Sequence, residues 1–257
     1  MEPRADHTVH SVDKAMRLLE VLMQKRRPVS LQELSADCGY PKSTVHALLN
    51  TLRLHQAIRQ EQDGRYALGV RLFELGCAVS AAWDVTRLAR PYLESLSDRT
   101  GAGAFLSVWE GQNAITLDQC AGGELLVVPE TGSRLPLHAT AQGKLFLSLM
   151  GDAAVRRLLP RLTLRAYTPH TLTDPRDLLS ALEEIRTNGY AVEDGEYRIG
   201  LRAAAAPVCD RSGRQYAIGV IGLFRRTGSD EFRAAVDSTL QSARQLEQAL
   251  GAEIPTL

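Results

Sequence analysis

The sequence has little of what marks the specialised classes of protein. Only 5% of its 257 residues are aromatic, its four cysteines lie far apart with no CxxC pair, and its formal net charge is zero. No stretch without Asp, Glu, Lys or Arg exceeds ten residues, whereas a membrane-spanning helix needs about 20 apolar residues. These absences exclude a disulfide scaffold and a transmembrane chain. The first ten residues lack the apolar core of a signal peptide, so we expect a cytoplasmic protein with no membrane partner.

The compact motifs of the common enzyme classes are also missing. There is no GxSxG, HExxH or GxGxxG motif, and Leu145 follows Gly143-Lys144 where a P-loop requires serine or threonine. No Cys/His cluster has the spacing of a zinc site, so we expect no metal and no cofactor. Carboxylates gather at Glu193, Asp194 and Glu196, but such a run is more typical of a solvated strand end than of an acid–base pair. We therefore expect a protein that is not an enzyme.

Helical periodicity is clear in the first 55 residues. Apolar side chains at helical spacing predict a first helix over residues 11–25. Ser30 then precedes Glu33 by three residues, the capping-box arrangement that begins a second helix. Glycine and proline at residues 39–41 predict a tight turn, and apolar periodicity resumes over residues 42–54. The pattern predicts helix, turn and helix.

Polar and basic side chains lie opposite the apolar stripe of the helix over residues 42–54. Asp63-Gly64 follows as a two-residue hairpin signal with Arg59 and Arg65 on its two arms, which predicts a basic wing. Such side chains contact phosphates and base edges in a major groove. The candidate DNA-binding residues are Lys42, Ser43, Thr44, His46, Asn50, Arg53, Arg59 and Arg65. The alternative is an adaptor whose polar outer face binds protein and never meets DNA.

The segment from residue 69 to residue 83 is apolar around most of its circumference. Arg71 and Glu74 are its only charges, and at about 1.5 Å per residue it is too short to cross a membrane. An exposed helix of this kind would present a large apolar patch to solvent, and a second copy of the chain could cover it. We therefore interpret residues 70–84 as a linker that forms a homodimer. The alternative is burial against this chain's own domains.

The rest of the chain alternates short strand patterns with helical ones. The order predicts an α+β fold in which helices cover an antiparallel sheet. The expected strands span residues 103–109, 114–120, 124–129, 190–194, 201–208 and 216–224. The expected helices span residues 139–150 and 175–188, with a last helix capped by Ser229. Three domains follow: a winged helix-turn-helix over residues 9–69, the linker over 70–84, and an α+β domain over 85–251.

Several segments of this domain resemble the IclR-type bacterial transcription regulators. They are residues 132–144, 188–191, 200–202 and 205–208, and the winged helix and linker precede them in the expected order. The resemblance implies a GAF-like effector-binding domain, homodimers that often pair into tetramers, and control of operator DNA binding by small molecules. In this family the effectors are frequently organic acids or aromatic compounds.

The sequence departs from the family pattern at the ligand-contacting strands. Ala203 stands where the family often has cysteine, and Gly219 and Ile221 stand where it often has two serines. The start of the helix near Ala139 still offers free N–H groups to an anionic or polar atom. The candidate effector-binding residues are Ser107, Trp109, Leu117, His138, Ala139, Thr140, Ala141, Gln142, Glu193, Ala203, Gly219 and Ile221.

These residues predict a small-molecule effector with one polar or acidic end and an apolar, aromatic or aliphatic body. Neither a dicarboxylate nor a densely hydroxylated compound fits the apolar wall. Two alternatives stay open at this point. The side chains, His138 included, can simply fill a core, or the pocket can belong to an enzyme that the winged helix regulates.

Overall fold

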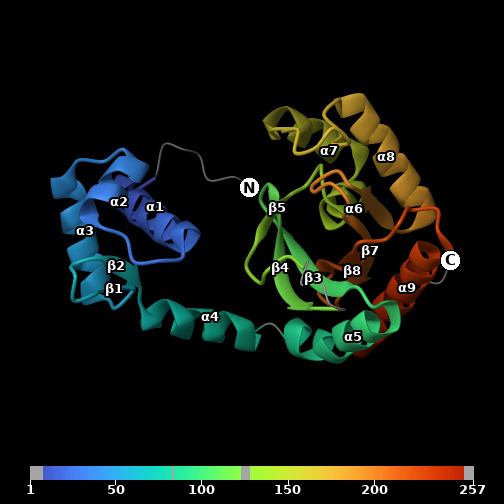
Figure 1. Ribbon diagram of the computed structural model, residues 1–257, viewed down its shortest axis with the longest axis horizontal. Helices are drawn as coiled ribbons and strands as arrows, with labels where there is room; N and C mark the ends of the chain where they lie inside the picture. Colours follow the sequence, from blue (N-terminus) through green and yellow to red (C-terminus); the bar gives the residue numbers. More distant parts are fainter. Residues whose placement is uncertain (1–7, 83, 123–127, 252–257) are drawn as a thin grey trace. The chain divides into compact units, whose positions relative to one another are not determined.

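The computed structural model describes residues 8–82, 84–122 and 128–251. The chain divides into two compact units, Met1–Trp83 and Asp84–Leu257 (Figure 1). Among the described residues, no helix has the length and apolar character that crossing a membrane requires.

Three helices and a hairpin make up the described part of the first unit before α4, as the sequence predicts. Their bounds are α1 His10–Lys25, α2 Leu31–Cys38, α3 Lys42–Leu54, β1 Ile58–Gln60 and β2 Tyr66–Leu68. The capping box of α2 is present: the Ser30 hydroxyl accepts the Glu33 N–H at 3.2 Å, and the Glu33 carboxylate accepts the Ser30 N–H at 3.0 Å. Hydrogen bonds from Arg27 and Ser30 lower the pKa of Glu33 to about 2. Leu18, Leu34 and Leu49 meet in the core of the unit.

The hairpin of this unit differs from its prediction in the length of its turn. The last strand pair is Gln60 with Tyr66, so the loop is longer than the two residues that Asp63-Gly64 predicts. The Gly64 N–H donates to the Glu61 carbonyl at 3.0 Å, and Gly64 takes a φ of +81°. A turn followed by a left-handed glycine is the usual form of a longer hairpin loop, in which the glycine comes last.

Helix α4 (Val70–Ala82) follows the hairpin and carries exposed apolar side chains. Phe73 is 71% exposed, Val70 61% and Leu75 51%. The helices and hairpin of the first unit therefore do not cover these apolar side chains.

The second unit is built on a six-stranded antiparallel sheet in the order β5-β4-β3-β8-β7-β6. The strands are β3 Gly103–Glu110, β4 Asn113–Cys120, β5 Arg134–Pro136, β6 Ala191–Asp194, β7 Arg202–Cys209 and β8 Gln215–Gly222. Five of them lie within a residue or two of the predicted strands. The sixth predicted strand, over residues 124–129, falls mostly outside the described residues, and β5 fills the place beside β4.

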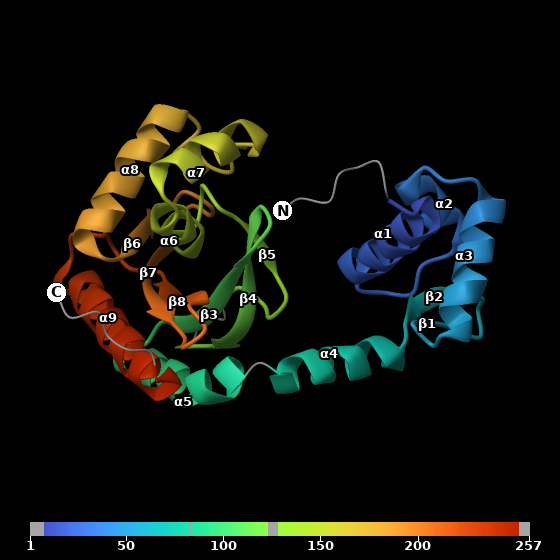
Figure 2. The ribbon, with the colours of Figure 1, turned by 180° about the vertical axis from the view of Figure 1, so that it is seen from behind.

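Helices cover both faces of this sheet. They are α5 Asp84–Thr100, α6 Ala141–Leu149, α7 Asp152–Leu158, α8 Pro175–Asn188 and α9 Asp230–Leu250, with a short 3-10 helix at Leu159–Arg161. Figures 1 and 2 show α5 and α9 together on one side of the sheet and α6, α7 and α8 on the other. Helix α8 has its predicted bounds, whereas α6 begins two residues later than predicted because Thr140 is its N-cap.

We call the sheet face that meets α6 the inner face. Phe105, Ala203, Ala205 and Ala217 lie on it and share a core cluster with Ala141 and Leu145 of α6. Gly219 lies opposite Phe105 on the neighbouring strand. A Cβ atom at Gly219 would collide with the Phe105 ring and the Ala204 carbonyl. The Ala204 carbonyl and the Phe105 ring together therefore leave no space for a side chain at Gly219.

Candidate DNA-binding and effector-binding sites

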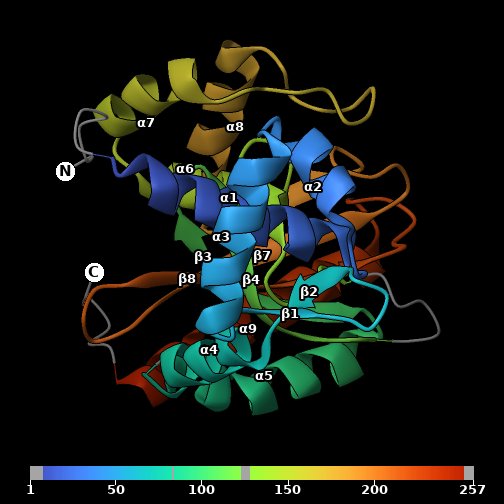
Figure 3. The same ribbon diagram turned by 90° about the vertical axis from the view of Figure 1, so that its left-hand side faces the viewer.

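The outer face of α3 carries the side chains that the sequence analysis predicts to contact DNA. Val45 and Leu49 are fully buried and fix the orientation of the helix. Lys42, Ser43, His46, Asn50 and Arg53 are exposed on its other side, and Thr44 is half-buried. Figure 3 shows α3 in front of the first unit, with the hairpin near its C-terminal end.

Three of these side chains form a continuous row with the hairpin. The Asn50 amide lies 3.3 Å from Nδ1 of His46. The Arg53 guanidinium donates to Oε1 of Gln60 on β1 at 2.9 Å and makes a longer contact of 3.5 Å with Oδ1 of Asn50. Each of these contacts limits the rotamers of the next side chain, so the row holds its exposed donors and acceptors in one arrangement.

The hairpin is not the basic arm that its arginines predict. Arg59 pairs with Glu61 at 2.9 Å and Arg65 with Asp63 at 3.3 Å. The four charges sum to zero, so the attraction of the hairpin for phosphate is weaker than two free arginines would give. All four side chains are at least a third exposed, and such surface pairs open readily.

The pairing register of the strands shows which candidate effector-binding residues lie on the inner face. Glu193 lies opposite Ala203, and Ala203 lies opposite Ile221. Ser107 lies opposite Ala217, two residues along β3 from Phe105. The structure therefore brings Ser107, Glu193, Ala203 and Ile221 to the same face of the sheet.

The start of α6 lies buried beside this face. The Thr140 hydroxyl accepts the Gly143 N–H at 3.2 Å, and its carbonyl accepts the Lys144 N–H at 2.9 Å. The N–H groups of Ala141 and Gln142 lie between them and have no partner among the described residues. Because both residues are buried, these two donors suit an anionic or polar ligand atom.

A buried set of charges lies next to the same site, against the prediction of a solvated strand end. Glu193 is 2% exposed and Glu196 7%, and Glu196 forms an ion pair with Lys144 of α6. Burial, together with the neighbouring Glu196, raises the pKa of Glu193 to about 7, although the Tyr197 N–H bond and Lys144 oppose the rise. Glu193 therefore changes its charge near neutral pH.

Three other candidates lie at the margin of the inner face. The Trp109 indole is 39% exposed and donates to the Gly111 carbonyl of its own turn at 2.8 Å. Leu117 is half-buried at an irregularity in the β3–β4 pairing. His138 is buried, and its Nε2 lies 3.0 Å from the Arg165 carbonyl. The structure thus gives His138 a structural contact, and it leaves Trp109 partly exposed.

The sequence missed two polar residues of the inner face. Thr116 lies opposite Ser107, and Gln119 lies opposite Phe105. Strict strand alternation would put residues 116 and 119 on opposite faces. No local signal in the sequence reveals the irregularity that places them on one face.

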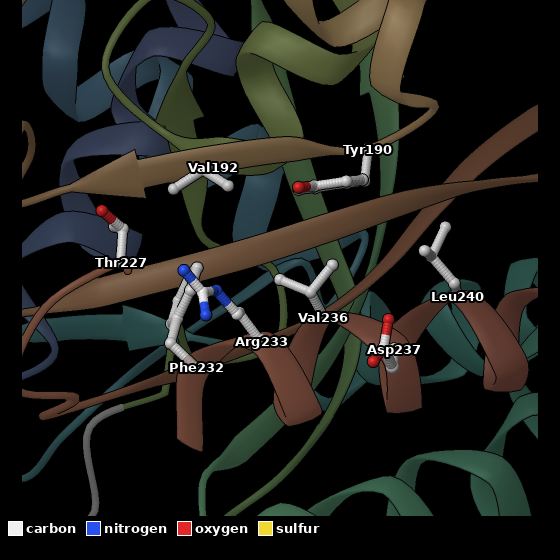
Figure 4. A pocket seen from close by; sticks show the side chains of 8 residues that line it. All are labelled: Tyr190, Val192, Thr227, Phe232, Arg233, Val236, Asp237 and Leu240. Carbon is white, nitrogen blue, oxygen red and sulfur yellow. The ribbon is translucent and has the colours of Figure 1, made fainter. Parts of the chain in front are cut away.

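A pocket of about 450 Å³ lies elsewhere, between the edge strand β6 and helix α9 (Figure 4). Val192, Phe232, Val236 and Leu240 give it an apolar floor, and Arg233 and Asp237 lie at its edge. Val192 lies opposite Ala204, on the face of the sheet away from α6. None of the candidate effector residues lines this pocket.

A helix-turn-helix unit followed by an α+β unit with a partly polar inner face defines a two-domain transcriptional regulator. The model for the IclR helix-turn-helix domain matches residues 11–62, and the model for the bacterial transcriptional regulator IclR C-terminal region matches residues 77–248. The chain belongs to the IclR family.

Curated relatives and solved structures are similar to this chain over nearly its whole length. The chain is 32% identical to the HTH-type transcriptional regulator XynR of Escherichia coli, covering 95% of this chain and 98% of that protein. It is 30% identical to the transcriptional repressor IclR of the same organism, covering 95% and 90%. A crystal structure of a regulator from Alicyclobacillus acidocaldarius superposes with a TM-score of 0.82 at 28% identity, covering 96% and 100%. These relatives are named as regulators of transcription and not as enzymes.

Proposed function

We propose that this protein binds operator DNA through α3 and the hairpin, and that a small-molecule effector in the second unit changes this binding. The observation that carries the proposal is the exposed row from His46 through Asn50 and Arg53 to Gln60. Its side chains offer donors and acceptors for base edges. Lys42, Ser43 and Thr44 occupy the first turn of the same helix, where N–H groups and a cation suit phosphate.

Selection of bound fragments from random oligonucleotides tests the DNA part of the proposal. We expect one enriched, roughly two-fold symmetric sequence and affinity that falls steeply with salt. Asn50→Ala should change the enriched bases, because Asn50 is placed to read a base edge. Asn188→Ala, an exposed asparagine at the end of α8, serves as the matched control and should change nothing. Absence of salt-sensitive binding to any sequence would overturn the proposal.

We propose further that residues 9–69 bind DNA, that residues 70–84 join two copies, and that residues 85–251 bind the effector. The exposed apolar side chains of α4 support the joining role, since a second copy is the surface that would cover them. A homodimer presents two copies of α3 to two half-sites. Pairing of two dimers into a tetramer, as in related regulators, is compatible with this arrangement.

The effector in this proposal is a small organic acid held on the inner face. The free N–H groups of Ala141 and Gln142 bind its carboxylate, while Ala203 and Ile221 contact its apolar body. A structure described as an IclR homolog from Microbacterium hydrocarbonoxydans complexed with 4-hydroxybenzoate has the same fold, with a TM-score of 0.83 at 23% identity, covering 95% of this chain and all of that one. That ligand is a monocarboxylate with an aromatic body.

Calorimetry with monocarboxylates, dicarboxylates and neutral aromatics tests the effector part. We expect a monocarboxylate to bind and to shift operator affinity, because an effector must bind the two DNA-binding states unequally. Ile221→Ser should weaken that binding, whereas Leu223→Ser, at a leucine that is 55% exposed just after β8, should leave it unchanged. Exclusive binding of a dicarboxylate would contradict the site as described.

A further inference from the structure

Three polar side-chain atoms on the β3–β4 hairpin are buried without a hydrogen-bond partner among the described residues. They are Oγ of Ser107, Oγ1 of Thr116 and Oε1 of Gln119. Ser107 is fully buried and Thr116 is 1% exposed. The large majority of buried polar atoms in proteins have a partner, so three such atoms on one hairpin point to a partner that the described part of the chain does not supply.

An irregularity in the strand pairing brings the three side chains together. Ser107 pairs with Thr116 and Leu106 with Asp118, so Leu117 is the extra residue of β4. This bulge lets Thr116 and Gln119 face the same side although they are three residues apart. Directly opposed residues have Cβ atoms about 4.5–5.5 Å apart, which places the Ser107 and Thr116 hydroxyls side by side.

The three atoms need a particular set of hydrogen-bond donors and acceptors from a partner. The hydroxyls of Ser107 and Thr116 each donate one proton, whereas Oε1 of Gln119 only accepts. One hydroxyl group matches this set, because it donates one proton and accepts through two lone pairs. A carboxylate accepts only and would leave Gln119 without a donor.

The inner face around this point is lined by small side chains. Ala217 on β8 lies opposite Ser107, and Ala205 on β7 lies opposite Gly219; both alanines are fully buried. The Phe105 ring lies opposite Gln119 and supplies an apolar contact. Ala203, Gly219 and Ile221 on β7 and β8 carry no polar side-chain atom, so the hydroxyls of the hairpin supply polarity at this part of the inner face.

We infer that Ser107, Thr116 and Gln119 form a second polar subsite that binds a hydroxyl group, so the effector is a hydroxylated monocarboxylic acid. The inference rests on the proposed function, in which the carboxylate of the same ligand lies at the start of α6. It adds Thr116 and Gln119 to the site, and it assigns to the effector a second polar group that the sequence does not predict.

Calorimetry on the full-length protein with matched acids tests the subsite. The probes are benzoate with its 3-hydroxy and 4-hydroxy derivatives, and hexanoate with 6-hydroxyhexanoate. We expect at least one hydroxylated acid to bind tenfold or more tightly than its parent. Thr116→Val and Ser107→Ala should each remove most of that preference.

Thermal unfolding of the ligand-free protein separates a binding role from a structural one. Removing an unpaired buried hydroxyl loses no hydrogen bond, so Thr116→Val should raise the unfolding midpoint by about 2 °C or more. Thr239→Val is the matched control, since Thr239 is equally buried but donates to the Ala235 carbonyl at 2.8 Å. The control should lower the midpoint.

The outcomes distinguish failure of the subsite from failure of the effector site. Equal affinity for the parent and hydroxylated acids, or an unchanged preference in Thr116→Val, would overturn the subsite and leave the proposed carboxylate site intact. A lower unfolding midpoint for Thr116→Val would show that its hydroxyl is structural. If none of the five acids binds, both the effector proposal and the subsite are wrong.

Discussion

The guanidinium of Arg53 on α3 donates to Oε1 of Gln60 on β1 at 2.9 Å. This bond joins the helix that we propose faces DNA to the hairpin beside it, so the two elements can meet a duplex as one surface. The residues are seven apart in the sequence, beyond the reach of a helical turn. The bond therefore depends on how the hairpin packs against α3.

The charge balance of the hairpin gives the first prediction. Asp63→Asn removes the acidic partner of Arg65 and leaves the hairpin with one net positive charge. Binding to all DNA sequences should tighten, and the slope of log affinity against log salt should steepen by about one unit. Arg65→Ala should change the slope by about one unit in the opposite direction. Fluorescence anisotropy across a salt series measures both, with Asp230→Asn in the second unit as control.

The exposed face of α4 gives the second prediction. Val70 and Phe73 lie one turn apart on this helix. Replacing both by Glu places like charges in the proposed dimer interface, where an unpaired charge costs several kcal/mol. Sedimentation should show monomers and operator affinity should largely disappear. Leu223→Glu, at another exposed leucine, should leave the dimer intact. A wild-type protein that is monomeric at micromolar concentration would contradict the prediction.

The titration of Glu193 gives the third prediction. Its pKa rises from 4.5 to about 7 on folding, so between these values the folded state holds a proton that the unfolded state has released. The free energy of unfolding should therefore fall as pH rises from about 4.5 to 7, by up to about 3 kcal/mol. Above pH 7 the contribution of this group is constant.

Replacing this carboxyl tests the assignment. Glu193→Gln should flatten the decline and make the protein more stable than wild type at pH 8, with little difference at pH 4.5. Urea denaturation at a series of pH values measures the effect. Glu184→Gln, an exposed glutamate on α8, should reproduce the wild-type curve. An unchanged pH dependence in Glu193→Gln would show that another group is responsible.

The buried ion pair of Lys144 and Glu196 gives the fourth prediction. Glu196→Ala leaves a buried ammonium without its partner and should lower the free energy of unfolding by about 3–5 kcal/mol. The double variant Lys144→Met, Glu196→Leu should recover most of that loss, because neither charge then stays buried. Arg233→Ala breaks an exposed pair with Asp230 and should leave the urea midpoint unchanged. A double variant as unstable as the single one would contradict this account.

The sequence by itself determined the elements whose signals are local. The capping box of Ser30 and Glu33 begins α2, and Asp174 and Gly189 bound α8 at the predicted residues. The apolar stripe of α3 likewise settles which of its side chains face outward. Each of these signals acts within one or two helical turns, so it is fully present in the linear sequence.

Tertiary structure decided which polar groups meet. Glu193 and Glu196 look like a solvated run, but the pairing of β6 with β7 and the ion pair to α6 bury them. The bulge at Leu117 turns Thr116 and Gln119 to one face, against simple alternation. These outcomes depend on strands and helices that are distant in the sequence, and burial, register and the free energies they set arise only when those elements pack.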